Sequence, residues 1–95
     1  MNQRAAIVTR VDLSADRIIG NSETITIFGI ILANSSSFDA EIDISDIVGT
    51  KKITVSVPSH DSKNIEIEFI ADNGLRIDGI GSDKVYATVF HSHGG

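Results

Sequence analysis

The chain has 95 residues, no cysteine and a formal net charge of −5 at neutral pH. Its length fits one domain with one hydrophobic core, and the lack of cysteine excludes disulfides and thiolate metal sites. Apolar residues make up 41% of the chain but aromatic residues only 5%. With sixteen isoleucines and a single proline, the composition predicts a core of β-branched side chains, which favour strands.

The charge is distributed unevenly. Residues 1–36 carry three basic and three acidic side chains, whereas residues 37–95 carry five basic and ten acidic ones. Binding to a phosphate backbone requires clustered lysine and arginine, so we expect no nucleic-acid partner. The longest apolar run, residues 27–33, is too short to span a bilayer, and the first ten residues lack the apolar segment of a signal peptide. We expect no membrane association. We expect the chain to be made in a reducing cytoplasm.

Seven apolar stretches recur about every ten residues, separated by clusters of Gly, Asn, Asp and Ser. The expected strands cover residues 5–13, 24–33, 40–45, 53–57, 65–69, 75–80 and 84–91. Residues 16–19 are expected as a helical turn or a loop, and residues 59–62 as a loop. The spacing predicts one all-β domain over residues 1–95, a single β-sandwich of about seven short antiparallel strands, Ig-like or jelly-roll-like. Residues 1–4 and 92–95 are expected to be flexible.

Alternation within the strands assigns side chains to the core. The most regular alternation occurs at residues 65–69, where apolar and acidic side chains follow one another. The residues expected to be buried are Ile42, Ile44, Val55, Val57, Ile65, Ile67, Phe69 and Val89.

Two of the expected strands, at residues 27–33 and 85–90, are apolar on both faces. Gly29 in the first of them indicates a bulge or a close backbone approach. One sandwich core covers only one face of each sheet, so the second face needs a loop, the N-terminal segment or a neighbouring subunit. For a chain this short we favour the neighbour and expect a homo-oligomer. The residues expected at or near that contact are Phe28, Ile30, Tyr86 and Phe90.

Metal ligands are sparse in the sequence. His91 and His93 lie two apart and would share one face of a strand, as metal ligands often do, with His60 as a distant third candidate. Nothing in the sequence fixes that third ligand nearby. The carboxylates between Asp39 and Asp46 lack the glycine-bearing loop of a calcium site and fit the solvent-facing side of an alternating strand. We expect no metal and no cofactor.

Catalytic residues are equally poorly indicated. Ser59, His60 and Asp61 are the residue types of a hydrolytic triad, but neighbours in a loop do not generally point their side chains at one another. A turn explains the triplet better. We therefore expect no enzyme activity. We expect a structural role or a role in binding other molecules.

Four runs carry a resemblance to a known family: residues 30–37 (IILANSSS), 57–67 (VPSHDSKNIEI), 69–75 (FIADNGL) and 85–92 (VYATVFHS). In strand order and style over roughly residues 24–92, the chain resembles the small β-sandwich virion proteins of tailed bacteriophages. That resemblance implies a virion structural protein that is assembled in the host cytoplasm. Among such proteins it favours a capsid decoration or cement protein. Its partners would be the major capsid protein or another virion protein, bound by a homo-oligomer. Arg4 and Arg10, in an N-terminal segment without a counterpart in that family, are expected to reach the capsid surface.

Two alternatives remain open on the sequence. One is a phage neck or tail fitting. The other is a carbohydrate- or ligand-binding β-sandwich module, although the absence of Trp and the single Tyr count against the stacking of sugars on aromatic rings.

Overall fold

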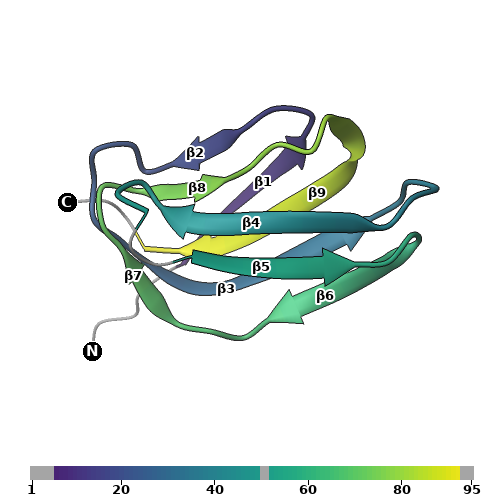
Figure 1. Ribbon diagram of the computed structural model, residues 1–95. Helices are drawn as coiled ribbons and strands as arrows, with labels where there is room; N and C mark the ends of the chain where they lie inside the picture. The colour runs from purple at the N-terminus through teal and green to yellow at the C-terminus, as the bar shows by residue number, and fades with distance from the viewer. Residues whose placement is uncertain (1–5, 50–51, 93–95) are drawn as a thin grey trace.

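The computed structural model describes residues 6–49 and 52–92, which form a β-sandwich of nine strands in two layers (Figure 1). The strands are β1 Ile7–Leu13, β2 Arg17–Ile19, β3 Ile25–Asn34, β4 Ala40–Asp46, β5 Lys52–Val57, β6 Asp61–Ile65, β7 Phe69–Ala71, β8 Leu75–Ile77 and β9 Ser82–His91. A five-strand sheet has the order β1-β9-β3-β6, with β7 also paired to β3, and a four-strand sheet has the order β2-β8-β4-β5. Each of these pairings is antiparallel. The predicted all-β sandwich is confirmed.

Strand β2 was not expected, since residues 16–19 were assigned to a helical turn or a loop. It pairs with β8, where Ile18 lies opposite Arg76, and it buries Ile19 against the core. Three residues are too few for alternation to reveal a strand, because only one side chain of β2 reaches the interior. The pairing with a distant strand decides its conformation.

The single strand expected over residues 65–69 is wrong. Strand β6 ends at Ile65 and β7 begins at Phe69, and both pair with β3, opposite Ile30 and Ile27 respectively. Between these two positions the register of β3 against β9 shifts, so that Phe28 is an extra residue in the ladder. The bulge indicated by Gly29 is therefore confirmed in the ladder with β9, and on the opposite edge of β3 the pairing passes from β6 to β7 beside it.

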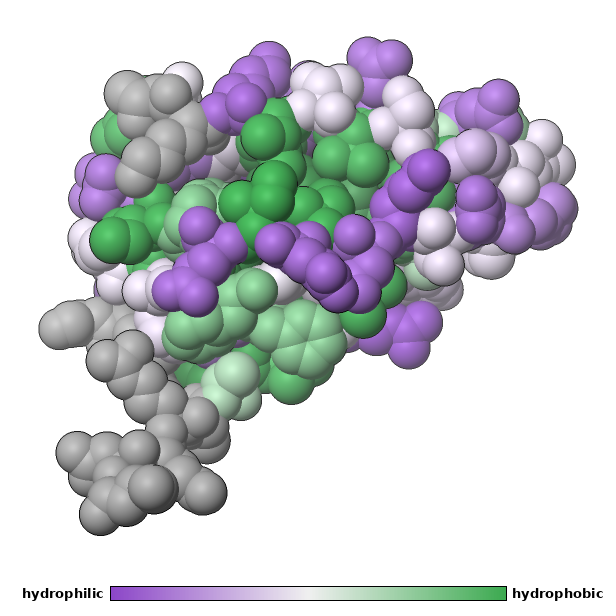
Figure 2. Space-filling view, turned by 90° about the horizontal axis from the view of Figure 1, so that it is seen from below, coloured by the Kyte–Doolittle hydropathy of each residue, from purple (hydrophilic) through white to green (hydrophobic). Residues whose placement is uncertain are grey.

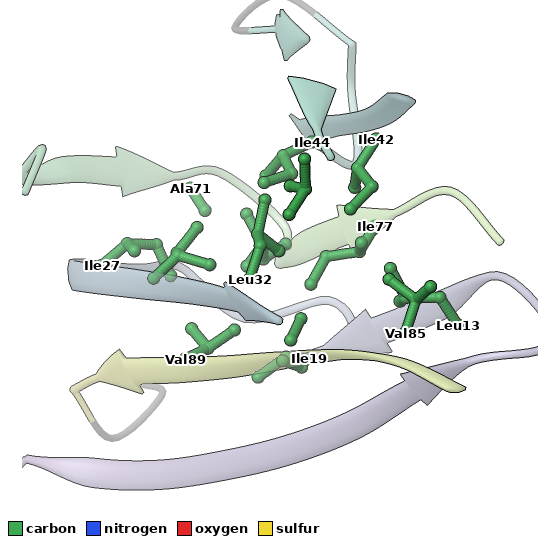
Figure 3. Packing of buried hydrophobic residues seen from close by; sticks show 14 of the residues in the cluster. Leu13, Ile19, Ile27, Leu32, Ile42, Ile44, Ala71, Ile77, Val85 and Val89 are labelled. Carbon is green, nitrogen blue, oxygen red and sulfur yellow. The ribbon is translucent and has the colours of Figure 1, made fainter. Parts of the chain in front are cut away.

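The core lies between the two sheets and consists of aliphatic side chains, of which Figure 3 shows a large part. Four residues of the predicted core, Ile42, Ile44, Val57 and Val89, are fully buried. Val55, Ile65 and Phe69 are half-buried and pack against the core. Ile67 is 49% exposed, because residues 66–68 lie outside the strands, opposite the bulge. Its assignment to the core is a wrong prediction.

The expected flexibility of residues 1–4 and 93–95 lies outside the described residues. Ser92 is described and continues the ladder beyond β9: its amide donates to the Thr26 carbonyl at 2.9 Å, and its hydroxyl accepts from the Thr26 amide at 2.8 Å. Within the described parts of the chain, no helix has the length and hydrophobicity needed to cross a membrane.

Candidate interaction surface

The outer face of the five-strand sheet carries apolar side chains from three adjacent strands. Val8 on β1 lies opposite Phe90 on β9, and Phe90 in turn lies opposite Gly29 on β3. Further along the same face, Ile31 lies opposite Thr88. Val8 is 58% exposed and the others are half-buried. We call this surface the aromatic face and define it by Val8, Phe28, Ile31, Tyr86 and Phe90.

Strand β9 contributes to both sides of the sheet through its alternation. Val85, Ala87 and Val89 are buried in the core, whereas Tyr86 and Phe90 are half-buried on the outer face. The outward position expected for these two aromatic residues agrees with the structure. Their part in binding a partner stays a prediction.

Ile30 does not lie on this face, although the sequence predicted it at a subunit contact. It is 1% exposed and belongs to the core. Because Phe28 is the extra residue of the bulge, the alternation of β3 restarts one position later, so that Ile30 turns inward and Ile31 outward. Sequence reasoning missed Ile31, although Gly29 was the available signal for this change of phase.

A hollow of about 610 Å³ opens on the aromatic face beside the bulge. Its lining includes Phe28, Gly29, Ile31, Asn64, Glu66 and Phe90. The absence of a side chain at Gly29 leaves room between the two phenylalanines, and the polar groups of Asn64 and Glu66 stand on the β6 side. The hollow can therefore take a large apolar side chain with a polar or basic neighbour.

Arg10 is the charged residue beside the aromatic rings. Its guanidinium carbon lies 4.5 Å from the centroid of the Tyr86 ring, a cation–π contact. The sequence expected Arg10 to be a partner-binding residue, and the structure places it next to Tyr86. Arg4, expected to act with it, lies outside the described residues.

Asp12 borders the same face, opposite Tyr86 in the ladder. The Ser14 hydroxyl and the Ser14 amide donate to its carboxylate at 2.6 and 3.1 Å, and Arg17 Nη2 donates at 2.9 Å. These contacts, with the Ser14 hydroxyl the strongest and the Arg17 charge assisting, lower the pKa of Asp12 to about 2. Asp12 therefore remains ionised at physiological pH and holds Arg17 beside the end of β1.

Apart from the exposed Ile18 on β2, the outer face of the four-strand sheet is polar and charged. Asp43 accepts from the Thr54 hydroxyl at 2.6 Å and lies 3.6 Å from the Lys52 ammonium. Arg76 forms ion pairs with Asp16 at 2.9 Å and with Asp78 at 3.0 Å. With the exposed Glu41, carboxylates outnumber basic groups on this side.

The residues considered for chemistry are used in structural contacts. The Ser59 hydroxyl donates to the Ser36 carbonyl at 2.6 Å, so its one proton is held in a structural contact. His91 is buried, with Nδ1 donating to the Ser92 carbonyl and Nε2 sharing a hydrogen bond with the Thr9 hydroxyl, each at 2.8 Å.

His93, the other half of the expected pair, lies outside the described residues. The described residues contain no group of three or more His, Cys, Asp or Glu side chains that could hold a metal ion.

Comparison with family models finds no match, and comparison with curated proteins finds none either. Among solved structures, the chain is similar to the NLP core of Drosophila, whose crystal structure is described as giving insight into pentamer formation and histone binding. The TM-score is 0.62 at 12% sequence identity, and the match covers 94% of this chain and 99% of that one. The fold is a nucleoplasmin-like jelly roll.

This match corrects the resemblance drawn from the sequence. The chain was compared with phage virion proteins on strand order and polar turns, features that unrelated β-sandwiches share. A solved structure that covers nearly the whole chain, the Drosophila core, is described in terms of pentamer formation and histone binding. The phage resemblance, the capsid decoration role with its alternatives, the capsid partner and the virion location are therefore wrong.

Proposed function

We propose that the chain is a non-catalytic assembly domain of nucleoplasmin type, which forms a homo-oligomeric ring and binds basic proteins such as histones. The observation that carries the proposal is the aromatic face, because three strands of a well-packed sandwich turn apolar side chains away from their own core. Extended apolar surfaces of this kind mark sites of protein association. The fold supports the same proposal, since the Drosophila core is described in terms of pentamer formation and histone binding.

The charge of the chain supports the second half of the proposal. Ten of the thirteen acidic residues lie within residues 37–95, and the outer face of the four-strand sheet carries Glu41, Asp43 and Asp78. A ring would multiply this negative charge by the number of copies. Repeated acidic surfaces attract a basic partner by long-range electrostatics and by many weak contacts acting together. A nuclear location follows from the histone-binding part of this proposal.

The test is a titration of fluorescently labelled core histones with the purified protein at increasing salt. We expect saturable binding that weakens steeply as ionic strength rises, because exposed charges are screened. Glu41→Lys should weaken binding while leaving the sedimentation of the protein alone unchanged.

The matched control is Thr54→Ser on the same sheet face, which preserves charge and the hydroxyl donor to Asp43. Binding that is absent at low salt, or that is equally strong for Glu41→Lys and at high salt, would contradict the histone-binding part. A wild-type protein that is monomeric would contradict the assembly part.

A further inference from the structure

The turn between β7 and β8 carries the chain from the five-strand sheet to the four-strand sheet (Figure 1). Its residues are Asp72, Asn73 and Gly74. Asn73 is exposed with a φ of 62°, and Gly74 is buried with a φ of 109°. Asparagine tolerates a positive φ, and glycine adopts it without steric cost. The turn therefore holds an asparagine side chain in water directly before a glycine.

An asparagine in front of a glycine can lose its side-chain amide without an enzyme. The backbone nitrogen of the glycine attacks the side-chain carbonyl carbon Cγ, a tethered reaction with a high effective concentration. A C–N bond forms, and ammonia leaves with the proton of that nitrogen. Water then adds to one of the two carbonyl carbons of the cyclic imide and opens the ring. The products are aspartate and isoaspartate, in which the main chain runs through the side-chain carboxyl group, and only water is consumed.

The other described asparagines do not meet these conditions. Of the five asparagines in the chain, Asn73 alone precedes a glycine. The side chain of Asn34 is buried, and its Nδ2 donates to two backbone carbonyls at 2.8 and 3.0 Å, which hold the leaving group in place. Asn64 lies in β6 before the β-branched Ile65, which crowds the attacking nitrogen. Asn21 is exposed but precedes a serine.

We propose that Asn73 is a site of non-enzymatic modification, where the side-chain amide is lost through the ring formed with the Gly74 nitrogen. The hydrogen bonds of the turn set the rate. The Asn73 carbonyl accepts from the Ser22 amide at 2.9 Å, and the Gly74 carbonyl accepts from the Ile47 amide at 3.0 Å. These bonds hold the peptide group that contains the reacting nitrogen and the peptide group after it. Ring closure follows local opening of the turn and is slower in the folded than in the unfolded chain.

The folded turn has no room for the isoaspartate product. A Cβ at Gly74 would lie 2.4 Å from the Gly20 carbonyl oxygen, so the two turns approach each other through backbone alone. Isoaspartate inserts one further carbon, about 1.5 Å of chain, directly before Gly74. The lengthened turn loses this close packing, whereas the aspartate product keeps the original main chain. The isoaspartate form should therefore unfold at a lower denaturant concentration than the Asn73→Asp variant.

This modification site is separate from the surface assigned to assembly. The aromatic face belongs to β1, β3 and β9, whereas the turn joins β7 to β8. The hydrophobic surface seen from the side of β6 and β7 in Figure 2 is formed by other residues, because the turn consists of Asp, Asn and Gly. Failure of the proposed assembly would therefore leave this inference standing, and its own failure would leave the proposed assembly standing.

The experiment follows the amide of each asparagine while the purified chain is incubated in mildly alkaline buffer, folded or unfolded in urea. Trypsin cleavage after Lys63 and Arg76 releases Asn64 and Asn73 in one peptide, residues 64–76, so mass spectrometry compares the two directly. We expect Asn73 to be converted while Asn64 stays intact, and the conversion to be several times faster in urea. Isoaspartate is detected by an isoaspartate methyltransferase, which transfers a labelled methyl group to it.

The matched control is Asn73→Gly, which keeps the positive φ and has no amide to lose. It should accumulate no isoaspartate, and equal labelling of this variant would overturn the assignment to Asn73. Conversion of Asn21 or Asn64 as fast as that of Asn73 would overturn it as well. An Asn73 that stays intact in the folded chain, or that yields aspartate without isoaspartate, would contradict the ring mechanism in the folded protein.

A second variant tests whether opening of the turn sets the rate. Gly20 has a φ of 73°, and a Cβ there would lie 3.0 Å from Ile25 Cγ2, so Gly20→Ala strains the turn that packs on Gly74. Conversion of Asn73 should become several times faster in this variant while its circular dichroism remains β-type. If Gly20→Ala is unfolded, the wild type in urea below its unfolding transition replaces it. A rate that stays unchanged would overturn the control by the turn.

Discussion

The outer faces of the two sheets follow the same alternation and differ in what the alternation exposes. On the four-strand sheet, the outward residues of β4, β5 and β8 are charged or hydroxylated and pair with one another, as Asp43 does with Thr54 and Lys52. On the five-strand sheet, the outward residues of β1, β3 and β9 include Val8, Ile31 and Phe90. The outward strands of the first face expose mainly polar and charged side chains to water. The second face exposes apolar side chains that association with another protein would bury.

This difference separates two tasks within one small domain. In the proposed function, burial of apolar surface between copies would supply the free energy of assembly, and the charged face would remain free to meet a basic partner. An interior built from aliphatic side chains alone would explain only the fold. The aromatic residues of β3 and β9 lie on the outer face of the five-strand sheet and are not part of the core.

Two consecutive residues of β3 give the largest expected contrast. Leu32 is fully buried and Ile31 lies on the aromatic face. In the Phe90→Asp background, which we expect to be monomeric, Leu32→Ala should cost about 2–5 kcal/mol of unfolding free energy. Ile31→Ala should cost well under half as much, because its side chain already contacts water. Chemical denaturation measures both, and equal costs would show that the two faces of β3 are not distinguished as described.

The contact between Arg10 and Tyr86 should contribute less to the free energy of unfolding than the buried side chain of Leu32. Arg10→Ala should cost about 0.5–1 kcal/mol of monomer stability, the range for an exposed cation–π pair. Tyr86→Leu, which keeps apolar bulk on the aromatic face, should remove the same amount. The Arg10→Ala change should then add nothing in a Tyr86→Leu background. Additive losses in this double-mutant cycle would contradict a direct interaction.

On the charged face, the ion pairs of Arg76 with Asp16 and Asp78 should contribute weakly. Arg76→Gln should cost no more than about 1 kcal/mol, because all three side chains are substantially exposed to water. The loss should shrink further in concentrated salt. A larger cost that persists at high salt would mean that this face is buried against a partner or another copy.

The smallest expected effect concerns the pH dependence of Asp12. The contacts with Ser14 and Arg17 lower its pKa from 3.8 to about 2 in the folded protein. A depressed carboxyl pKa stabilises the folded state above the unfolded pKa, and this contribution is lost as pH falls from about 4 to about 2. The stability difference between wild type and Asp12→Asn should therefore narrow over this pH window. A difference that stays constant would contradict the assigned cause.

Local pattern predicted most of the fold. Alternation in β4 and β9 assigned Ile42, Ile44 and Val89 correctly to the core, because each strand has one buried face and no irregularity over those residues. The pattern at residues 65–69 was just as regular but misleading. Pairing along this edge of β3 stops at Ile65 and resumes at Phe69, beside the stretch of β3 that bulges against β9 on its other edge.

The interaction surface was only partly within reach of the sequence. Phe28, Tyr86 and Phe90 were recognised as apolar residues in excess of one core, but Ile30 was given the position that Ile31 occupies. A single extra residue inverts every later side chain of a strand, and Gly29 alone did not give its position. The family resemblance was wrong for a different reason, because strand spacing and polar turns specify a sandwich and not its biological role.

Coverage of the aromatic face by another copy can be measured by sedimentation equilibrium over a range of micromolar concentrations. We expect the wild-type protein to sediment at a multiple of its 10.2 kDa chain mass. Phe90→Asp, still folded by circular dichroism, should sediment at the mass of one chain. A wild-type protein that stays at one chain mass at every concentration, or a Phe90→Asp variant that assembles like the wild type, would show that this face is not an interface between copies.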